Sequence, residues 1–300
     1  MVATATDVDV TRGFVKTPHG HIEYREAGEG EPFVILHTTP STSEQYQPLF
    51  GYFSGRYRVV APTTIGYGQS DRPPEPYTSV REFAQALSWF LDGLGLGSVH
   101  LFGAKTGAQV AIDLAGWQPG RVRSLVLDEP FDYCNEEGRA LHGRIHRYYP
   151  ERPDGGHLVE IWKRVGGGRP GADLADVNRS LMNLLAINAG GDDVRSIYGD
   201  MGWEGAGPHA ICHFPTFEHT PLIQAPSLVI HGSESRLRSL HDRFVETIPD
   251  ARGVLMGNAG LGESATRPAH LRGQFFAAQA PEEWSGAILR FLDETQRATA

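Results

Sequence analysis

The sequence SVHLFGAKTGAQVAIDLA, residues 98–115, joins a strand pattern to a helix pattern through a short turn. The apolar run at 98–102 is typical of a buried strand, and 108–115 is typical of a helix. Gly103-Ala104-Lys105-Thr106-Gly107 lies between them, with small residues around one projecting side chain. Glycines suit such a turn, because a left-handed backbone in a tight bend leaves no room for larger neighbours. The residue at the point of the turn is Lys105.

Outward from this turn, strand and helix patterns alternate along most of the chain. The first two strand patterns flank His19-Gly20, which predicts a hairpin. Helix patterns at 79–94 and 109–117 separate later apolar runs. Such alternation predicts an α/β fold whose mostly parallel central sheet has helices on both faces. The expected strands are 14–18, 21–26, 32–37, 57–62, 99–102, 122–128, 227–231 and 251–256.

The stretch 131–225 has a different character and falls after the sixth expected strand. It is rich in Gly, His, Arg and aromatic residues, and helix patterns occur at 141–149, 158–165 and 174–189. An insertion at the carboxyl edge of a parallel sheet would cover the site there. We therefore expect a core made of 1–130 and 226–300 with a helical cap between them. Some cap aromatics are expected to line the pocket: Tyr148, Tyr149, Trp162, Tyr198, Trp203, Phe214 and Phe217.

Composition limits the classes of partner. The formal net charge is −9, so a binding surface for nucleic-acid phosphates is not expected. The first nine residues lack a basic segment followed by an apolar one, and no apolar run approaches the roughly 20 residues that span a bilayer. These features predict a soluble cytoplasmic protein that does not contact membranes. Cys134 and Cys212 are expected to be free thiols.

Four blocks together resemble the α/β-hydrolase superfamily, in its capped branch with epoxide hydrolases and haloalkane dehalogenases. His37-Thr38-Thr39-Pro40 is similar to the family's His-Gly-x-Pro loop, and the run from Tyr57 to Pro73 is similar to its Pro-Gly-x-Gly-x-Ser segment. The turn around Lys105 resembles its nucleophile elbow, and Pro226 to Gly232 forms the fourth block. The resemblance implies an α/β-hydrolase core with a helical cap.

The resemblance also implies a nucleophile, an acid and a histidine in that chain order, and here the pattern fails. Lys105 stands at the nucleophile position and Ser235 where many members have the acid. Aligned on Gly273 and Phe275, the histidine position holds Gln274; a second alignment places Leu261 there. His270 is nearby, but its spacing fits poorly. An intact Ser-His-Asp triad is absent from the sequence.

One carboxylate matches an alternative position of the acid. In haloalkane dehalogenases the acid lies at the end of the preceding strand, and here that strand ends Leu127-Asp128-Glu129-Pro130. Glu129 follows Lys105 by 24 positions, an interval that matches the family. The resemblance thus implies a Lys105–Glu129 pair in the pocket. The alternative is that Glu129 faces solvent or caps a helix of the cap.

A lysine on the elbow could act in two ways. The helix macrodipole and burial favour a neutral amine, which would serve as a base or form a Schiff base. A nearby Glu129 favours an ammonium, which would bind a carboxylate, enolate or phenolate oxygen. The resemblance implies an anion hole made by the backbone N–H groups of Thr106 and Thr39. Thr38 replaces the loop glycine, and His37 has a structural role in the same loop.

Three functions remain open at this point. The first is an atypical, cofactor-free enzyme that acts next to a carbonyl of an apolar or polyketide-like metabolite through Lys105, as a lyase, isomerase or cyclase. The second is a hydrolase of an ester, lactone or related bond, and the third is a ligand-binding protein without catalysis. The expected partner is a small-molecule substrate, with no metal, and a homodimer is possible.

Overall fold

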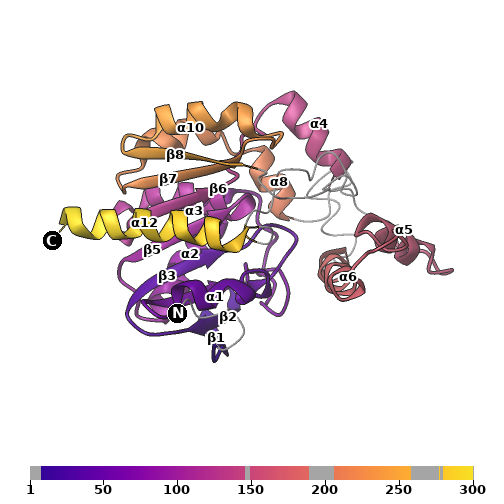
Figure 1. The fold of residues 1–300 in the computed structure, drawn as a ribbon. Helices are drawn as coiled ribbons and strands as arrows, with labels where there is room; N and C mark the ends of the chain where they lie inside the picture. The colour runs from indigo at the N-terminus through magenta and orange to yellow at the C-terminus, as the bar shows by residue number, and fades with distance from the viewer. Residues whose placement is uncertain (1–7, 146–148, 189–205, 258–276, 278–279, 300) are drawn as a thin grey trace.

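The computed structural model describes residues 8–145, 149–188, 206–257, 277 and 280–299. Its centre is an eight-stranded sheet in the order β1-β2-β4-β3-β5-β6-β7-β8 (Figure 1). Pairing is antiparallel for β1–β2 and β2–β4, and parallel from β4 onward. The strands are β1 (Thr11–Thr17), β2 (Gly20–Ala27), β3 (Glu31–Leu36), β4 (Tyr57–Pro62), β5 (Val99–Ala104), β6 (Val122–Asp128), β7 (Ser227–Gly232) and β8 (Ala251–Met256).

All eight strands predicted from the sequence are present, and the mostly parallel α/β fold is confirmed. The hairpin turn lies between Thr17 and Gly20, which are paired in the ladder. Every residue of β5 and β7 is buried, as expected of central parallel strands covered on both faces.

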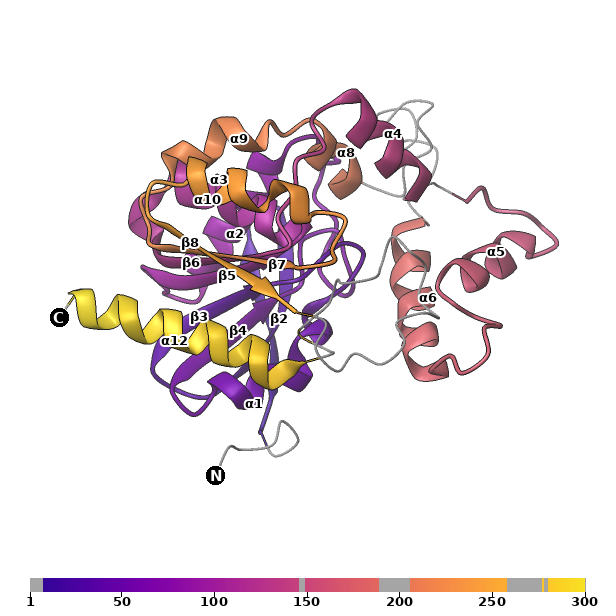
Figure 2. The ribbon, with the colours of Figure 1, turned by 45° about the horizontal axis from the view of Figure 1, so that its top comes forward.

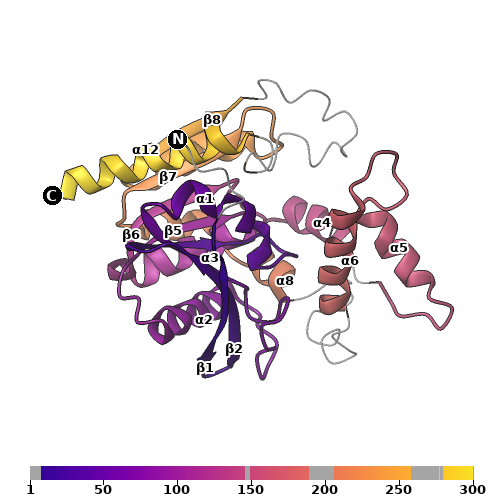
Figure 3. The same cartoon turned by 60° about the horizontal axis from the view of Figure 1, so that its bottom comes forward.

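Helices cover both faces of the sheet. One hydrophobic core lies between the sheet and α2, α3 and α10, and a second lies between the sheet and α1 and α12. Figure 3 shows α1 and the pair α2 and α3 on opposite sides of the strands. The helices of the core are α1 (Phe50–Phe53), α2 (Val80–Gly93), α3 (Thr106–Trp117), α10 (His241–Thr247) and α12 (Pro281–Thr299).

The chain between β6 and β7 is helical where it is described. Helices α5 and α6 lie beyond one end of the sheet, whereas α4 and α8 are nearer to it (Figure 2). Arg72 of the core donates a 2.9 Å hydrogen bond to the Ala186 carbonyl of α6, which links the two parts. The helices are α4 (Glu136–Ile145), α5 (Gly156–Arg164), α6 (Leu174–Asn188), α8 (Ala206–Cys212) and α9 (Thr216–His219).

Helix α4 begins five residues before the predicted start at 141. Its N-terminus is capped by Asn135, whose side-chain oxygen accepts a 2.7 Å hydrogen bond from the Gly138 N–H. Glu136 and Glu137 occupy the first turn, where the helix dipole favours acidic groups. The prediction followed the apolar residues and overlooked this polar cap.

Candidate functional site

Lys105 occupies a strained turn between β5 and α3. Its backbone has φ 50° and ψ −108°, a conformation that residues with a Cβ rarely adopt. The glycines around it allow a close approach of strand and helix. A Cβ on Gly107 would lie 2.7 Å from the Leu36 carbonyl oxygen, and one on Gly103 would lie 2.4 Å from the Gly107 carbonyl oxygen. The expected crowding around the elbow is therefore present.

Glu129 lies beside the elbow, immediately after β6, and is 2 % exposed. Its backbone is also left-handed, with φ 52°. Its carboxylate accepts a 2.7 Å hydrogen bond from the Gly232 N–H and a 2.5 Å hydrogen bond from the Ser235 hydroxyl. Ser235, which stands where many relatives have the acid, thus orients the carboxylate at the alternative position. Glu129 does not face solvent.

The charges of Lys105 and Glu129 interact inside the protein. Burial raises the pKa of Glu129, while the hydrogen bonds from Gly232 and Ser235 and the positive charges of Lys105 and Arg236 act in the opposite direction. The Lys105 side chain is half-buried. By the same attraction, the Glu129 carboxylate favours the ammonium form of Lys105. The structure therefore brings together three of the predicted site residues, Lys105, Glu129 and Ser235.

A second buried carboxyl, Asp128, was missed by the sequence prediction. It is the last residue of β6 and accepts a 3.2 Å hydrogen bond from the Trp284 indole N–H. Burial, together with the adjacent Glu129, raises the pKa of Asp128 to about 7, although Trp284 and Lys105 oppose this shift. Two acidic residues in succession after an apolar strand were the available signal. Their roles depend on partners far away in the sequence.

The loop after β3, residues 37–45, is called the anion loop below. Thr39 of this loop and Thr106, the first residue of α3, line the same cavity. An N–H in the first turn of a helix has no acceptor within the helix, so Thr106 can donate to a ligand. Among the described residues, none accepts a hydrogen bond from the Thr39 N–H. Both residues of the expected anion hole therefore line one cavity.

The other two predicted residues of the anion loop have structural contacts. His37 Nε2 accepts a 2.9 Å hydrogen bond from the Thr64 N–H, and its Nδ1 lies 2.8 Å from the Thr38 carbonyl oxygen. These partners require Nδ1 to carry the proton. Burial lowers the pKa of His37 to about 4, so its ring is neutral near pH 7. Thr38 donates to Gln45 Oε1 through its N–H at 3.1 Å and through its hydroxyl at 3.2 Å, so the hydroxyl that is added where the family has glycine has a partner.

The cavity beside Thr39 and Thr106 is narrow and apolar. Its volume is about 40 Å³, where one water molecule needs about 10–15 Å³. Neither Lys105 nor any of the four described cap aromatics (Tyr149, Trp162, Phe214 and Phe217) is among its described lining residues. Most of the apolar wall comes from the core: Leu36, Ile65, Tyr67, Val80, Phe83, Leu87, Phe90 and Val110, with Ile211 from α8.

Some predicted features lie outside the described residues. Gln274, Leu261 and His270 are among them, so the histidine position of the family pattern is not described. Within the described ranges, no three His, Cys, Asp or Glu side chains are grouped to hold a metal ion. None of the helices described there is both long enough and apolar enough to cross a bilayer.

Comparison with known proteins gives matches over part of the chain. A family model described as the alpha/beta hydrolase fold matches residues 31–153. A haloalkane dehalogenase from Agrobacterium fabrum is 36% identical over 105 residues, which are 35% of this chain and 34% of the relative. A haloalkane dehalogenase 2 from Mycobacterium tuberculosis is matched over 38% of its own length. The chain thus spans only about a third of the length of these curated relatives.

Solved structures resemble the whole chain. The structure of E-2-(acetamidomethylene)succinate hydrolase has a TM-score of 0.70 at 17% identity, and covers 95% of this chain and 100% of that one. A meta-cleavage product hydrolase from Pseudomonas fluorescens has a TM-score of 0.66 at 20% identity, and covers 94% of this chain and 97% of that one. At such low identity these likenesses establish the fold alone. The family model, the strand order and the strained elbow together show that the chain has the α/β-hydrolase fold, and the part matched by the sequence relatives is similar to haloalkane dehalogenases.

Proposed function

We propose that this protein is an enzyme that acts next to the carbonyl group of an apolar substrate, with the Lys105 ammonium binding the oxygen on which negative charge develops. The reaction is of the lyase, isomerase or cyclase type and needs no cofactor. The helices of 131–225 serve as a cap over the site. Lys105 replaces an attacking group with a fixed positive charge.

The observation that carries this proposal is the pairing of Lys105 with the buried carboxylate of Glu129. The carboxylate is held by Gly232 and Ser235 and is attracted to the Lys105 charge. Burial and the adjacent Glu129 raise the pKa of Asp128 to about 7, so Glu129 is the main negative neighbour of Lys105. The Glu129 carboxylate outweighs the unfavourable helix dipole, which contributes about 0.3–1 kcal/mol at an exposed terminus. We therefore assign Lys105 as a cation rather than a neutral base.

The anion hole supplies the other half of the site. The Thr39 and Thr106 N–H groups would donate to a substrate oxygen from the side of the cavity, while Lys105 stands on the adjoining point of the elbow. Fixed donors aimed at an oxygen that gains charge are typically worth a factor of about 100–1000 in rate. An enolate or phenolate oxygen would match this arrangement, and the apolar cavity would take a small hydrocarbon group next to it.

The proposal can be tested without knowing the substrate. Nitrophenols that titrate near neutral pH serve as probes, because their phenolate form absorbs visible light. We expect the protein to bind the phenolate in preference to the phenol, and so to lower the pKa of the bound probe by at least one unit. Lys105→Met should abolish this shift, while Lys163→Met, which changes a lysine of α5, should retain it.

Two results would contradict the proposal. One is a phenol pKa that shifts equally in the wild-type protein and Lys105→Met, or no binding of the probe at all. The other is a reduced adduct on Lys105 after incubation with ketones and borohydride. A Schiff base needs a neutral amine, so trapping would favour Lys105 as a nucleophile instead.

A hydrolase is the second candidate, favoured by the sequence likeness to haloalkane dehalogenases. In that case the anion hole would bind the oxyanion of an ester or lactone, and Lys105 or a positioned water molecule would attack. Activated esters of short acids and haloalkanes test this directly, by release of nitrophenolate or halide. Turnover that disappears in Lys105→Ala, without any phenolate preference, would favour hydrolysis over the first proposal.

A further inference from the structure

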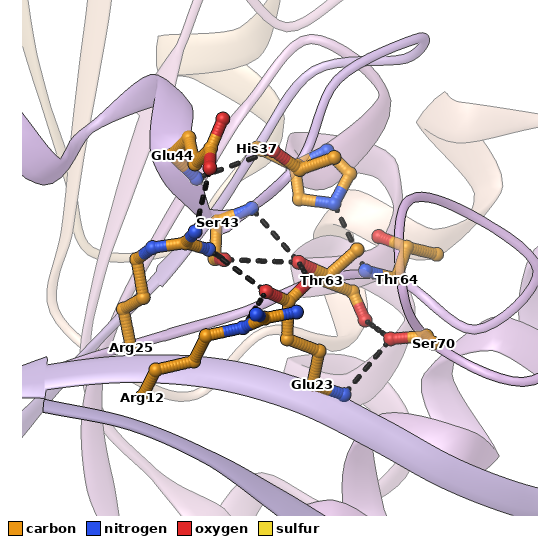
Figure 4. Close-up of polar contacts among 10 residues, drawn as sticks. Arg12, Glu23, Arg25, His37, Ser43, Glu44, Thr63, Thr64 and Ser70 are labelled. Carbon is orange, nitrogen blue, oxygen red and sulfur yellow. Dashed lines mark hydrogen bonds and ion pairs between the residues drawn. The ribbon is translucent and has the colours of Figure 1, made fainter. Parts of the chain in front are cut away.

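A buried polar cluster lies behind the anion loop and takes no part in the functions considered above. Its centre is Glu23 of β2, which is 2 % exposed. Figure 4 shows two arginines that converge on its carboxylate. Arg12 Nε donates to Glu23 Oε1 at 2.7 Å, and Arg25 Nη1 donates to the same oxygen at 3.0 Å. An ionised group so deep in the protein needs such partners, because an unpaired buried charge is strongly destabilising.

The second oxygen of Glu23 leads to the anion loop. The Thr63 hydroxyl donates to Glu23 Oε2 at 3.0 Å, and the Thr63 oxygen accepts a 2.9 Å hydrogen bond from the Ser43 N–H. Ser43 belongs to the anion loop, so two successive hydrogen bonds join its backbone to the Glu23 carboxylate. Both bonds are buried, where hydrogen bonds are electrostatically stronger than in water.

Arg25 makes a second connection to the same loop. Its Nη1 donates to the Ser43 hydroxyl at 2.5 Å, and its Nη2 donates to Glu44 Oε1 at 2.6 Å. The guanidinium group therefore bridges Glu23 to two consecutive residues of the anion loop. A planar guanidinium with several donors in fixed directions is suited to this task.

The segment after β4 closes the cluster on the other side. The Glu23 N–H donates to the Ser70 hydroxyl at 2.9 Å, and this hydroxyl donates to the Thr63 carbonyl at 2.7 Å. The next N–H, that of Thr64, donates to His37 at the start of the anion loop. Glu23 is thus linked to both ends of the loop segment that contains Thr39: to Ser43 through Thr63, and to His37 through Thr63 and its neighbour Thr64 (Figure 4).

We propose that Glu23 is a positioning residue that holds the anion loop, through Thr63 and Arg25, so that the Thr39 N–H points to the substrate oxygen. The role of Thr39 rests on the function proposed above, whereas the hold on the loop does not. Burial of a charged cluster seldom stabilises a fold more than apolar residues would. Stability alone therefore does not explain why the charged groups around Glu23 are buried, whereas a role in fixing the anion loop does.

Glu23→Gln tests the proposal, because it keeps the shape of the side chain but replaces an acceptor oxygen by a donor group. The first measurement is amide hydrogen exchange in the peptide covering residues 38–46, with the peptide covering 99–115 as internal reference. We expect exchange at Ser43 and Gln45 to become at least tenfold faster, with the reference peptide unchanged. The second measurement is the pKa of bound nitrophenol, whose shift should decrease to less than half.

Glu26→Gln is the matched control. Glu26 lies on the same strand and accepts a 2.8 Å hydrogen bond from Arg58, but it has no bond to the anion loop. We expect it to change neither measurement. If Glu23→Gln does not fold, Thr63→Val removes the bridging hydroxyl and leaves both arginines on Glu23, and the same acceleration of exchange is expected.

The outcomes separate this proposal from the proposed function. Exchange in 38–46 that stays at the wild-type rate, or that accelerates equally in Glu26→Gln, overturns the role of Glu23. If exchange in Glu23→Gln is faster but the pKa shift of bound nitrophenol is undiminished, Glu23 holds the loop without directing the Thr39 N–H to the substrate oxygen, and that part of the proposal is overturned. If the wild-type protein does not shift the phenol pKa, the proposed function fails, and the exchange rates alone still decide whether Glu23 holds the loop.

Discussion

Lys105 and Glu129 both have positive φ, of 50° and 52°, and each immediately follows one of two neighbouring strands. They are the two non-glycine residues with positive φ in the part of the chain that the structure describes. Their preceding residues, Ala104 and Asp128, are paired in the β5–β6 ladder, so the two strained positions lie side by side. Left-handed backbone at residues with a Cβ costs about 1–3 kcal/mol and clusters at functional sites. Two adjacent cases with side chains of opposite charge support a functional role for this pair.

The strain at Lys105 predicts an inverted order of stability for two substitutions. Lys105→Gly and Lys105→Ala both remove the amine, so they differ only in the backbone conformation they allow. We expect the glycine variant to have the larger free energy of unfolding, by about 1 kcal/mol or more, because glycine adopts positive φ without cost. Denaturation in urea measures the difference.

Arg290, exposed in the middle of α12, provides the control pair. There Arg290→Gly should be less stable than Arg290→Ala by up to about 1 kcal/mol, as glycine is in helices generally. An alanine variant at position 105 as stable as the glycine variant would show that the elbow is not strained.

The charge of Lys105 can be followed through its chemical reactivity. Glu129→Gln removes a negative neighbour, so the neutral amine of Lys105 should become more populated near pH 8 and react several-fold faster with trace acetic anhydride. Mass spectrometry measures the rate relative to the other two lysines, Lys16 and Lys163. Glu234→Gln, at an exposed position, should have no effect.

The pH dependence of the reaction rate distinguishes a change in the charge of Lys105 from a change in the access of the reagent to it. The variant and the wild-type protein should react at the same rate at a pH high enough to deprotonate both. A constant ratio at every pH would mean that Glu129→Gln only opens the site, and the electrostatic pairing would then be wrong.

The sheet could be predicted from the sequence because its strands are short apolar runs bounded by turn residues. The small helices α8 and α9 were missed, since seven and four residues show no clear periodicity. The N-terminal cap at Asn135 was overlooked for another reason. Its signal lies in polar residues ahead of the apolar pattern, whereas the prediction weighed the pattern itself.

The candidate site was predictable only in part. Family spacing placed Lys105 and Glu129 together, and both lie at the elbow. The role of Asp128 could not be predicted, because its partner Trp284 is 156 positions away. The cluster around Glu23 was hidden for the same reason: its contacts join three separate segments that only the fold brings together. Local patterns contain no information about such pairings.

Two buried histidines predict loss of stability in mild acid. Burial lowers the pKa values of His37 and His231 to about 4, from 6.5. Between these values the unfolded chain binds more protons than the folded one, so each histidine makes the free energy of unfolding fall by about 1.4 kcal/mol per unit of decreasing pH. We expect the slope between pH 6.5 and 4 to decrease by that amount in His37→Gln. The exposed His213 is the control, and an equal change in His213→Gln would contradict the assignment.

Asp128 should have the opposite dependence on pH. Its pKa is about 7 in the folded protein, against 3.8 for an aspartate side chain in water, because burial and Glu129 disfavour its charge. Between pH 4 and 7 the folded state keeps a proton that the unfolded state has lost. The contribution of Asp128 to stability therefore falls as pH rises through this range and is constant above it.

Asp128→Asn isolates this contribution, because an amide stays neutral and can still accept the hydrogen bond from the Trp284 indole. The free energy of unfolding of the variant minus that of the wild-type protein should increase by about 1 kcal/mol per pH unit from pH 4 to 7, then level off. Urea denaturation at a series of pH values gives this difference, and Asp250→Asn, at an exposed position, should give a flat line. Parallel curves for Asp128→Asn and the wild-type protein would mean that Asp128 is ionised in the fold. The Lys105 ammonium would then stand between two full negative charges, which would leave it too well neutralised to attract a substrate oxyanion.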